Sequence, residues 1–95
     1  MKIPKQVTIG DTKYEVRRTS NDLRLGYISY ADHVISISRV YFMGGRVSAY
    51  EQADTFWHEL THGILHDMGH RLQNNEQFVT AFAKRRNNAV HSAKF

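Results

Sequence analysis

Hydrophobic and polar side chains alternate with a period of two in the first half of the chain. The alternation occurs in residues 7–9 and 14–16, which flank a turn-forming stretch that contains Gly10 and Asp11. It recurs in residues 26–30 and 34–38, which a three-residue loop separates. A period of two is typical of strands with one buried face, and short loops of this kind join antiparallel partners. The first half is therefore predicted to form a small antiparallel sheet of three or four strands.

The spacing of apolar residues changes after residue 45 to the period of a helix. The apolar stripe of a first helix comprises Ala53, Phe56, Trp57, Leu60 and Ile64. Ser48 followed by Glu51 matches a capping box that begins this helix, and Gly69 is a signal for its end. A second helix is predicted from near Asn75, with an apolar face made of Phe78, Val79, Phe82, Ala83 and Val90. The predicted fold class is α+β, in which a small antiparallel sheet packs on one helix and a second helix follows.

Length and composition indicate one ordinary globular domain over residues 1–95. Apolar residues make up 41% of the chain and charged residues 23%, which is unlike a disordered or membrane-embedded protein. The absence of cysteine excludes disulfides and thiolate metal sites, so a bound metal needs histidine, carboxylate or water as ligands. The sequence has neither a signal-peptide pattern nor an apolar run of membrane-spanning length. We therefore expect a cytoplasmic protein with no membrane partner.

The first predicted helix carries the segment His58-Glu59-Leu60-Thr61-His62. Two side chains four residues apart lie on one face of a helix, so His58 and His62 can both reach one ion. Glu59 points about 100° away around the helix, which keeps it off the metal but allows it to contact a water bound there. The pattern predicts a zinc site in which Glu59 is the general base for the attack of zinc-bound water on a peptide carbonyl.

A third protein ligand is expected, because catalytic zinc sites usually have three. The metzincin pattern would place a glycine at 65 and a histidine at 68, whereas the chain has Leu65 and Met68. Glu76 is the preferred third ligand, because it opens the second predicted helix and an antiparallel helical hairpin would bring it against the histidines. His66, one further turn along the first helix, is the alternative. Two histidines and a carboxylate also suit iron, manganese or nickel, although the HExxH context favours zinc.

Two segments, residues 58–65 and 75–83, resemble the ImmA/IrrE-like metallopeptidases, particularly the short forms encoded by phages and prophages. The strand pair at 26–30 and 34–37 is similar to the pair that these proteins place before the active-site helix. Longer members of the family carry an additional helical domain for which this chain has no room. A target would then bind unaided, or a partner would supply recognition.

The resemblance implies a minimal zincin-like fold of the gluzincin type. It implies that His58, His62 and Glu76 hold zinc and that Glu59 is the catalytic base. It further implies that the protein hydrolyses a protein regulator, such as a repressor of a mobile element, in the cytoplasm of a host cell. In such folds the strand nearest the cleft aligns an extended peptide by sheet addition, and residues 34–38 are predicted to be that strand.

Two other functions fit the same residues. A non-catalytic binding module would use zinc to stabilise its fold and would capture a protein or nucleic-acid partner on a basic surface or a sheet edge. A nucleic-acid-binding protein is suggested by the formal net charge of +4 and by the basic run Lys84-Arg85-Arg86. Helices often gather basic residues toward their C-terminal half, however, so a solvated helix face is the preferred explanation of the run. The peptidase is the preferred interpretation because Glu59 lies beside the ligand pair.

Overall fold

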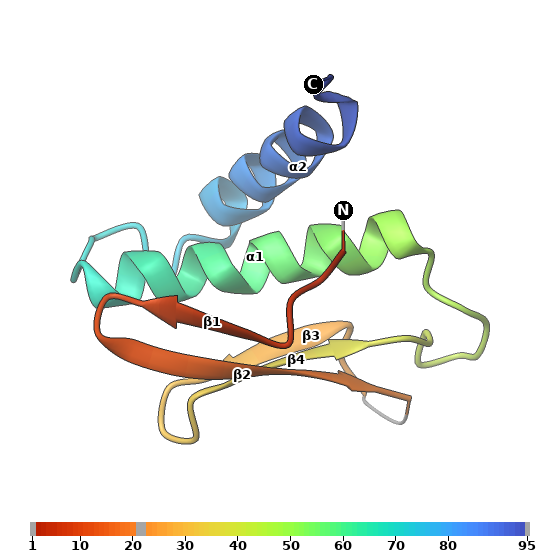
Figure 1. Ribbon diagram of the computed structural model, residues 1–95, viewed down its shortest axis with the longest axis horizontal. Coiled ribbons are helices and arrows are strands. Elements are labelled where there is room, and N and C mark those ends of the chain that lie inside the picture. Colours follow the sequence, from red (N-terminus) through yellow and green to blue (C-terminus); the bar gives the residue numbers. More distant parts are fainter. Residues whose placement is uncertain (1, 21–22, 95) are drawn as a thin grey trace.

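The computed structural model describes residues 2–20 and 23–94, which form a sheet and two helices (Figure 1). The strands are β1 (Gln6–Ile9), β2 (Thr12–Thr19), β3 (Gly26–Ser29) and β4 (Val34–Ser38). The helices are α1 (Ala49–Asp67) and α2 (Glu76–Ser92). The predicted α+β class is confirmed, and every predicted element occurs close to its expected position.

The sheet is mixed rather than wholly antiparallel. Both predicted hairpins are present, because β1 pairs with β2 and β3 pairs with β4 in antiparallel fashion. The hairpins join through β2 and β4, however, which run parallel from the pair Glu15 and Val34 to the pair Thr19 and Ser38. The strand order is β1-β2-β4-β3. The prediction of a wholly antiparallel sheet is therefore wrong at this one junction.

The central position of β4 explains this junction. All five residues of β4 are buried, so both of its faces and both of its edges are covered. Its serines, Ser36 and Ser38, are each only 1% exposed, although their alternation with apolar residues suggested a solvent face. The prediction that residues 34–38 lie at the cleft edge is therefore wrong. That edge belongs to β3, whose only strand partner in the described part of the chain is β4.

The helix boundaries follow the capping signals. Ser48 is the N-cap of α1, and its hydroxyl accepts a hydrogen bond from the Glu51 amide at 3.1 Å. Beyond the C-terminus of α1, Gly69 has a φ of +63°, a left-handed conformation that suits glycine. Asn75 caps α2 in the same way as Ser48 caps α1, by accepting from the Phe78 amide. Neither helix is long and apolar enough to cross a membrane, as judged over the described residues.

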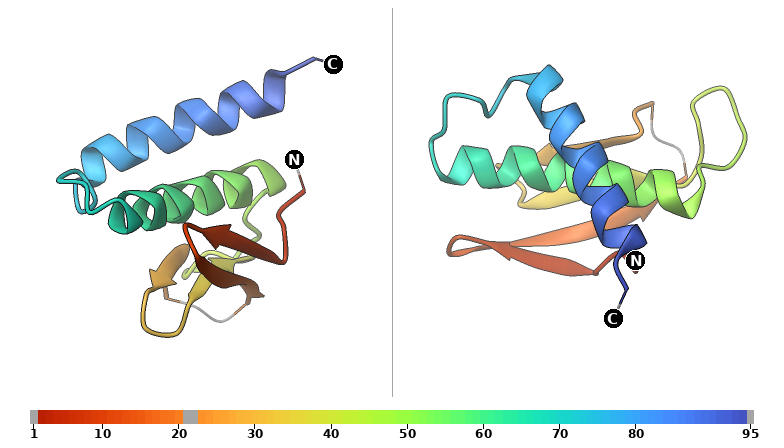
Figure 2. Two further views of the ribbon diagram at one scale, coloured as in Figure 1. Left: turned by 60° about the vertical axis from the view of Figure 1, so that its left-hand side comes forward. Right: turned by 90° about the horizontal axis from the view of Figure 1, so that it is seen from above.

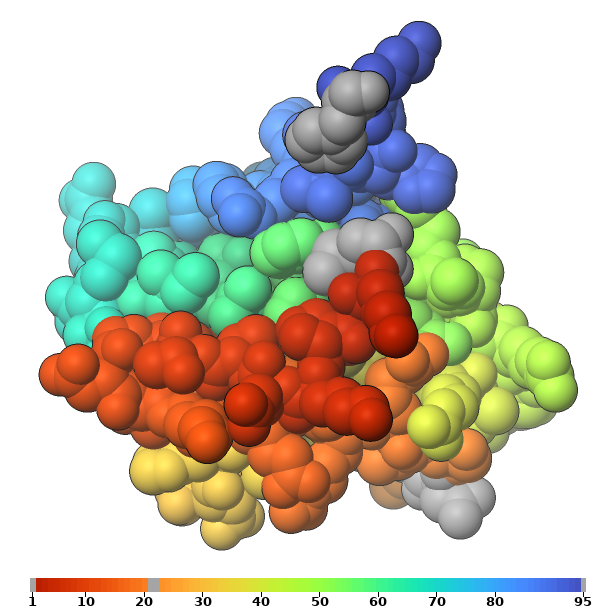
Figure 3. All heavy atoms as spheres, in the orientation of Figure 1, coloured from red at the N-terminus to blue at the C-terminus, as the bar shows by residue number. Residues whose placement is uncertain are grey.

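The molecule has three layers, with α1 between the sheet and α2 (Figure 2). Figure 3 shows the same arrangement on the surface, where the green atoms of α1 form a band between the orange strands and the blue second helix. After a loop, α2 returns obliquely across α1, and among the described elements α2 packs against α1 alone. Because the sheet and α2 cover two faces of α1, a site on this helix can lie only on the narrow flanks between them.

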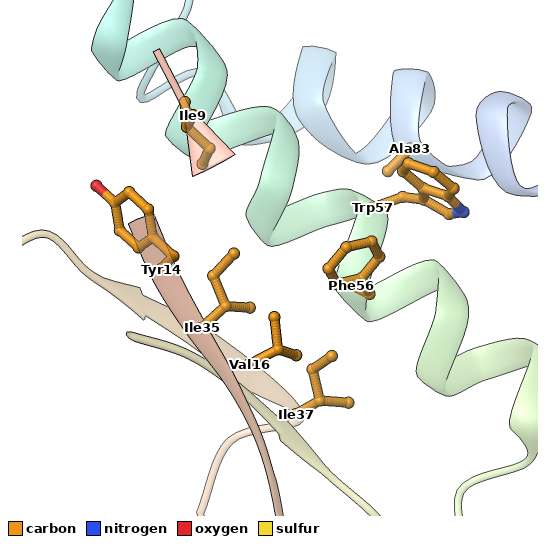
Figure 4. Packing of buried hydrophobic residues seen from close by; sticks show 8 residues of the cluster. All are labelled: Ile9, Tyr14, Val16, Ile35, Ile37, Phe56, Trp57 and Ala83. Atoms are coloured by element: carbon orange, nitrogen blue, oxygen red, sulfur yellow. The ribbon is translucent and has the colours of Figure 1, made fainter. Parts of the chain in front are cut away.

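The core lies between the sheet and α1 (Figure 4). Ile35 and Ile37 of β4 are fully buried beneath Phe56 of α1, and Trp57 turns toward α2, where it meets Ala83. The cluster is completed from β1 and β2 by Ile9, Tyr14 and Val16. The predicted core role of Phe56 and Trp57 is confirmed.

The buried stripe of α2 differs from the predicted one. Val79, Ala83 and Asn87 face α1 and are buried. The other predicted members, Phe78, Phe82 and Val90, are 37%, 43% and 39% exposed. Because α2 contacts one neighbour only, a narrow stripe suffices to dock it, and Asn87 belongs to that stripe because its amide donates to the Tyr50 carbonyl at 3.0 Å.

Candidate metal centre

The HExxH segment lies in the middle of α1, on the flank of the helix that faces β3. His58 and His62 are one turn apart, with ring centroids 5.0 Å from each other. Their side chains are 23% and 10% exposed, so both rings are largely shielded, and both residues line an open cleft. The helical spacing thus presents two imidazoles side by side, as the sequence predicts.

The carboxylate of Glu76 lies between the two imidazoles. Its Oε2 is 3.0 Å from Nε2 of His58, and its Oε1 is 2.8 Å from Nε2 of His62. Glu76 is the first residue of α2, so the return of the chain after the 68–75 loop delivers this carboxylate. Among the described residues, His58, His62 and Glu76 form the one group with potential ligand atoms within 4.8 Å of one another. His66 is not part of it.

The donor set fits a divalent metal ion. Two Nε2 atoms and a carboxylate face the same point, and such an arrangement requires positive charge among them, either protons on the imidazoles or a cation. Tetrahedral zinc with bonds of about 2.0–2.1 Å places its ligand atoms about 3.3 Å apart, so small side-chain movements would accommodate it. Iron and manganese also accept this set of ligands, so the geometry supports a metal site without selecting the metal.

A backbone carbonyl orients His62. Nδ1 of His62 lies 2.6 Å from the carbonyl oxygen of Gln73, in the loop between the helices. A carbonyl only accepts, so Nδ1 carries the proton and Nε2 is the nitrogen left for the triad. Outer contacts of this kind fix the tautomer and the ring orientation of metal-binding histidines. Sequence reasoning missed this contact, because a main-chain oxygen carries no residue signature.

Glu59 lies beside the triad but is not part of it. It is 9% exposed and lines the same cleft as the two histidines. Burial raises the pKa of its carboxyl above the usual value, His58 and His62 act in the opposite direction, and Glu76 adds to the rise. A buried carboxylate with a raised pKa is a stronger proton acceptor than an exposed one and suits a general base.

An open cleft of about 380 Å³ connects these groups to solvent. Its opposite wall is β3 with its flanking residues, from Arg24 to Tyr30. Gly26 allows this wall to approach α1, because a Cβ atom there would lie 2.4 Å from Cγ2 of Thr55 and 2.9 Å from the backbone oxygen of Ser36. Tyr27 and Tyr30, whose hydroxyl groups can donate hydrogen bonds, line the cleft.

The remaining histidines have other surroundings. His66 stacks on Tyr30 with ring centroids 3.7 Å apart, and its Nδ1 lies 3.0 Å from Oε1 of Gln73. His33 lies in the turn between β3 and β4, as predicted, with a φ of +54°. His91 meets the edge of Tyr50 near the end of α2, and His70 accepts from the Leu72 amide.

The basic run on α2 is distributed around the helix. Nζ of Lys84 is 3.9 Å from a carboxylate oxygen of Asp54. The guanidinium of Arg86 lies over the ring of Trp57, and Arg85 donates to the carbonyl of Ala81, one turn back. Each side chain of the run has an intramolecular contact, which supports the interpretation of the run as a solvated helix face.

No family model, no curated protein and no solved structure matches the chain.

Proposed function

We propose that this protein is a zinc-dependent metallopeptidase with a minimal zincin-like fold, similar to the ImmA/IrrE-like enzymes. The observation that carries the proposal is the carboxylate of Glu76, which lies within 3.0 Å of Nε2 of both His58 and His62. The order of elements also supports it: a sheet is followed by the HExxH helix, and a second helix begins with an acidic residue.

The residues divide into ligands and a base. His58, His62 and Glu76 would hold the ion, and a bound zinc ion would polarise a substrate carbonyl and acidify a water molecule. Glu59 would take the proton of the attacking water and pass it to the leaving amine, roles that require a carboxylate near the ligands but free of the metal. Its burial and its raised pKa favour both transfers.

The edge strand β3 supplies a surface for an extended substrate. Its outer edge has no strand partner among the described residues, and it forms one wall of the cleft. A peptide that added to this edge would pass directly in front of the ligands. Burial raises the pKa of the Tyr30 phenol, so this side chain stays a hydrogen-bond donor at neutral pH and could contact a polarised carbonyl. By the family resemblance, we propose a protein regulator of the mobile-element repressor type as the substrate.

Metal content is the first test of the proposal. Tag-free protein, purified without chelator and incubated with zinc, is expected to hold about one zinc per chain by mass spectrometry, in keeping with a single three-ligand site. His62→Ala and Glu76→Ala should lose it, whereas His70→Ala is a matched control that should keep it. Wild-type protein without bound metal would overturn the proposal.

Cleavage is the second test. Zinc-loaded wild type should cleave an unfolded protein mixture or a peptide library, and Glu59→Gln should bind zinc normally but lose cleavage by a factor of at least about 10². Equal cleavage by Glu59→Gln and wild type would show that Glu59 is not the base.

A zinc-stabilised binding module is the second candidate, and the position of Glu76 favours it specifically. The triad would link α1 to the first residue of α2, a helix that packs against α1 alone. A structural ion would therefore secure an element that has a single packing neighbour among the described elements. In that case Glu59→Gln would leave partner binding intact, and His62→Ala would loosen α2.

A further inference from the structure

A second hollow, of about 290 Å³, adjoins the cleft on the far side of Tyr30. We refer to it as the Asp67 pocket. It is lined by Thr12 and Tyr14 from β2, Tyr30 and His33 from the end and turn of the β3–β4 hairpin, and His66 and Asp67 from the end of α1. Tyr30 lines both hollows, so the pocket and the cleft share a wall at the end of β3. None of the triad residues lines it.

The carboxylate of Asp67 does not stabilise the helix that carries it. Asp67 is the last residue of α1, where the helix dipole disfavours a negative charge. In the described part of the chain, neither an ion pair nor a hydrogen bond compensates it. The β1–β2 turn passes directly over the carboxylate, since a Cβ atom on Gly10 would lie 2.6 Å from both of its oxygens. The chain thus places an exposed carboxylate, without an ion-pair partner among the described residues, beside the β1–β2 turn.

Aromatic rings wall the pocket around this carboxylate. Tyr30 stacks on His66, which Gln73 holds, and Tyr14 lies with its ring centroid 5.5 Å from that of His33. The charge of Asp67 acts inside the pocket: burial raises the pKa of the Tyr14 phenol, and Asp67 raises it further. No lysine or arginine of the described chain lines this pocket. Tyrosine faces attract cations, and a nearby carboxylate strengthens that attraction.

We infer that the Asp67 pocket binds a cationic side chain, that of lysine or arginine, from a peptide that lies along β3. Its use in a substrate rests on the peptidase proposed above, whereas the binding of the cation does not. The pocket is just large enough for one long side chain. At the opposite end of β3, Arg24 lines the cleft with its guanidinium over the ring of Tyr27. Arg24 at one end of β3 and Asp67 beyond the other end therefore place opposite charges along this strand, which orients a peptide whose basic residue lies at the Tyr30 end.

The pocket can be tested with a probe that needs no cleavage. Nα-acetyl-L-arginine amide is titrated into ¹⁵N-labelled full-length protein, metal-free and zinc-loaded, and amide chemical shifts are followed. Shifts are expected at Thr12, Tyr14, His33 and Asp67, and Nα-acetyl-L-glutamine amide should produce none of comparable size. Asp67→Asn should weaken binding of the arginine probe about fivefold, the effect of one solvent-screened ion pair, and Asp54→Asn is the matched control. Because the dipole disfavours Asp67, Asp67→Asn should remain folded with an undiminished Tm.

The outcomes separate this inference from the proposed function. Equal binding of the two amides, or equal binding of the arginine probe by wild type and Asp67→Asn, would overturn the cation pocket whether or not the protein holds zinc. Missing zinc or cleavage would overturn the peptidase and leave the pocket supported by its own titration. If cleavage occurs, Asp67→Asn should lower kcat/KM for peptides with arginine at one position and spare their glutamine counterparts. Equal loss on both peptides would overturn the role in substrate recognition.

Discussion

The buried carboxyl group of Glu59 is a candidate for catalysis, but in its ionised form it lowers the stability of the folded protein. The side chain is 9% exposed, and its burial raises the pKa of the carboxyl in the folded protein. A carboxylate whose folded pKa lies above its unfolded value destabilises the fold at high pH, because the folded state binds the proton more tightly. The stability linked to protonation of Glu59 is therefore fully present below the unfolded-state pKa of this carboxyl. It is lost as the pH rises through the folded-state pKa.

Replacing Glu59 by glutamine should therefore stabilise metal-free protein at neutral pH. Glutamine keeps the shape and removes the buried charge, so we expect a gain on the order of 1 kcal/mol, or about 4–8 °C in Tm for a domain of this size. Thermal unfolding in EDTA at pH 8 and at pH 4 measures it, and the gain should shrink at pH 4. Glu15→Gln is the control, because Glu15 is exposed and Arg17 lowers its pKa. A loss of stability in Glu59→Gln at pH 8 would contradict the argument.

The residue pattern predicts the three candidate metal ligands but not the groups that position them. His58 and His62 follow from helical spacing, and Glu76 follows from the start of the next helix. The Gln73 carbonyl that orients His62 and the absence of a side chain at Gly26 are not readable in the sequence. Both features depend on which segments pack together in the fold. Neither a backbone carbonyl nor the missing side chain of a glycine indicates in the sequence what it will contact.

Gly26 sets the distance between β3 and α1, and hence the width of the cleft. We expect Gly26→Ala to destabilise the protein by about 1–3 kcal/mol, as overpacking does, because the new methyl group would meet Thr55 and the Ser36 backbone oxygen. In the double variant with Thr55→Ser, which removes one of the two contacts, part of the loss should be recovered. Denaturant unfolding of the four proteins in this double-mutant cycle gives the coupling energy. Additive effects would show that β3 moves freely away from α1.

The cap of α2 links the stability of an element to the site. Asn75 accepts a hydrogen bond from the Phe78 amide, and the next residue, Glu76, contributes the carboxylate of the triad. Asn75→Ala should cost about 1 kcal/mol and fray the first turn, so zinc affinity should fall with it. Thermal unfolding and competition with a chromophoric chelator measure the two effects. Asn74→Ala is the control outside the cap, and an equal change in both variants would contradict the role of the cap.

The strand order is a property of the whole molecule that local patterns did not predict. Each hairpin was correctly predicted because its turn and its alternation lie within a few residues of one another. The junction of the hairpins depends on β2 and β4, whose paired residues Thr19 and Ser38 are far apart in sequence. Serine is small enough to be buried in a sheet, yet polar enough to suggest a solvent face. The alternation in residues 34–38 therefore predicts an edge strand, whereas the structure buries β4 inside the sheet and, among the described residues, leaves β3 as the edge at the cleft.

The stability of the whole molecule should depend on metal through α2. Within the part of the chain that the structure describes, this helix packs against α1 alone, so it can undock while the sheet and α1 remain folded. In metal-free protein we expect amide hydrogens of α2 to exchange faster than those of β4. Zinc would join Glu76 to the two histidines and should slow exchange in α2 at least about tenfold, which corresponds to roughly 1.4 kcal/mol of additional stability.

Hydrogen exchange followed by NMR with and without zinc makes this comparison, and Glu76→Ala is the control. In that variant two histidines remain on α1, so any residual zinc should protect α1 but should not slow exchange in α2. Uniform protection of β4 and α2 in metal-free protein would show that the chain unfolds as one cooperative unit. The ion would then stabilise the domain as a whole, because a ligand that binds only the native state raises its stability wherever it binds.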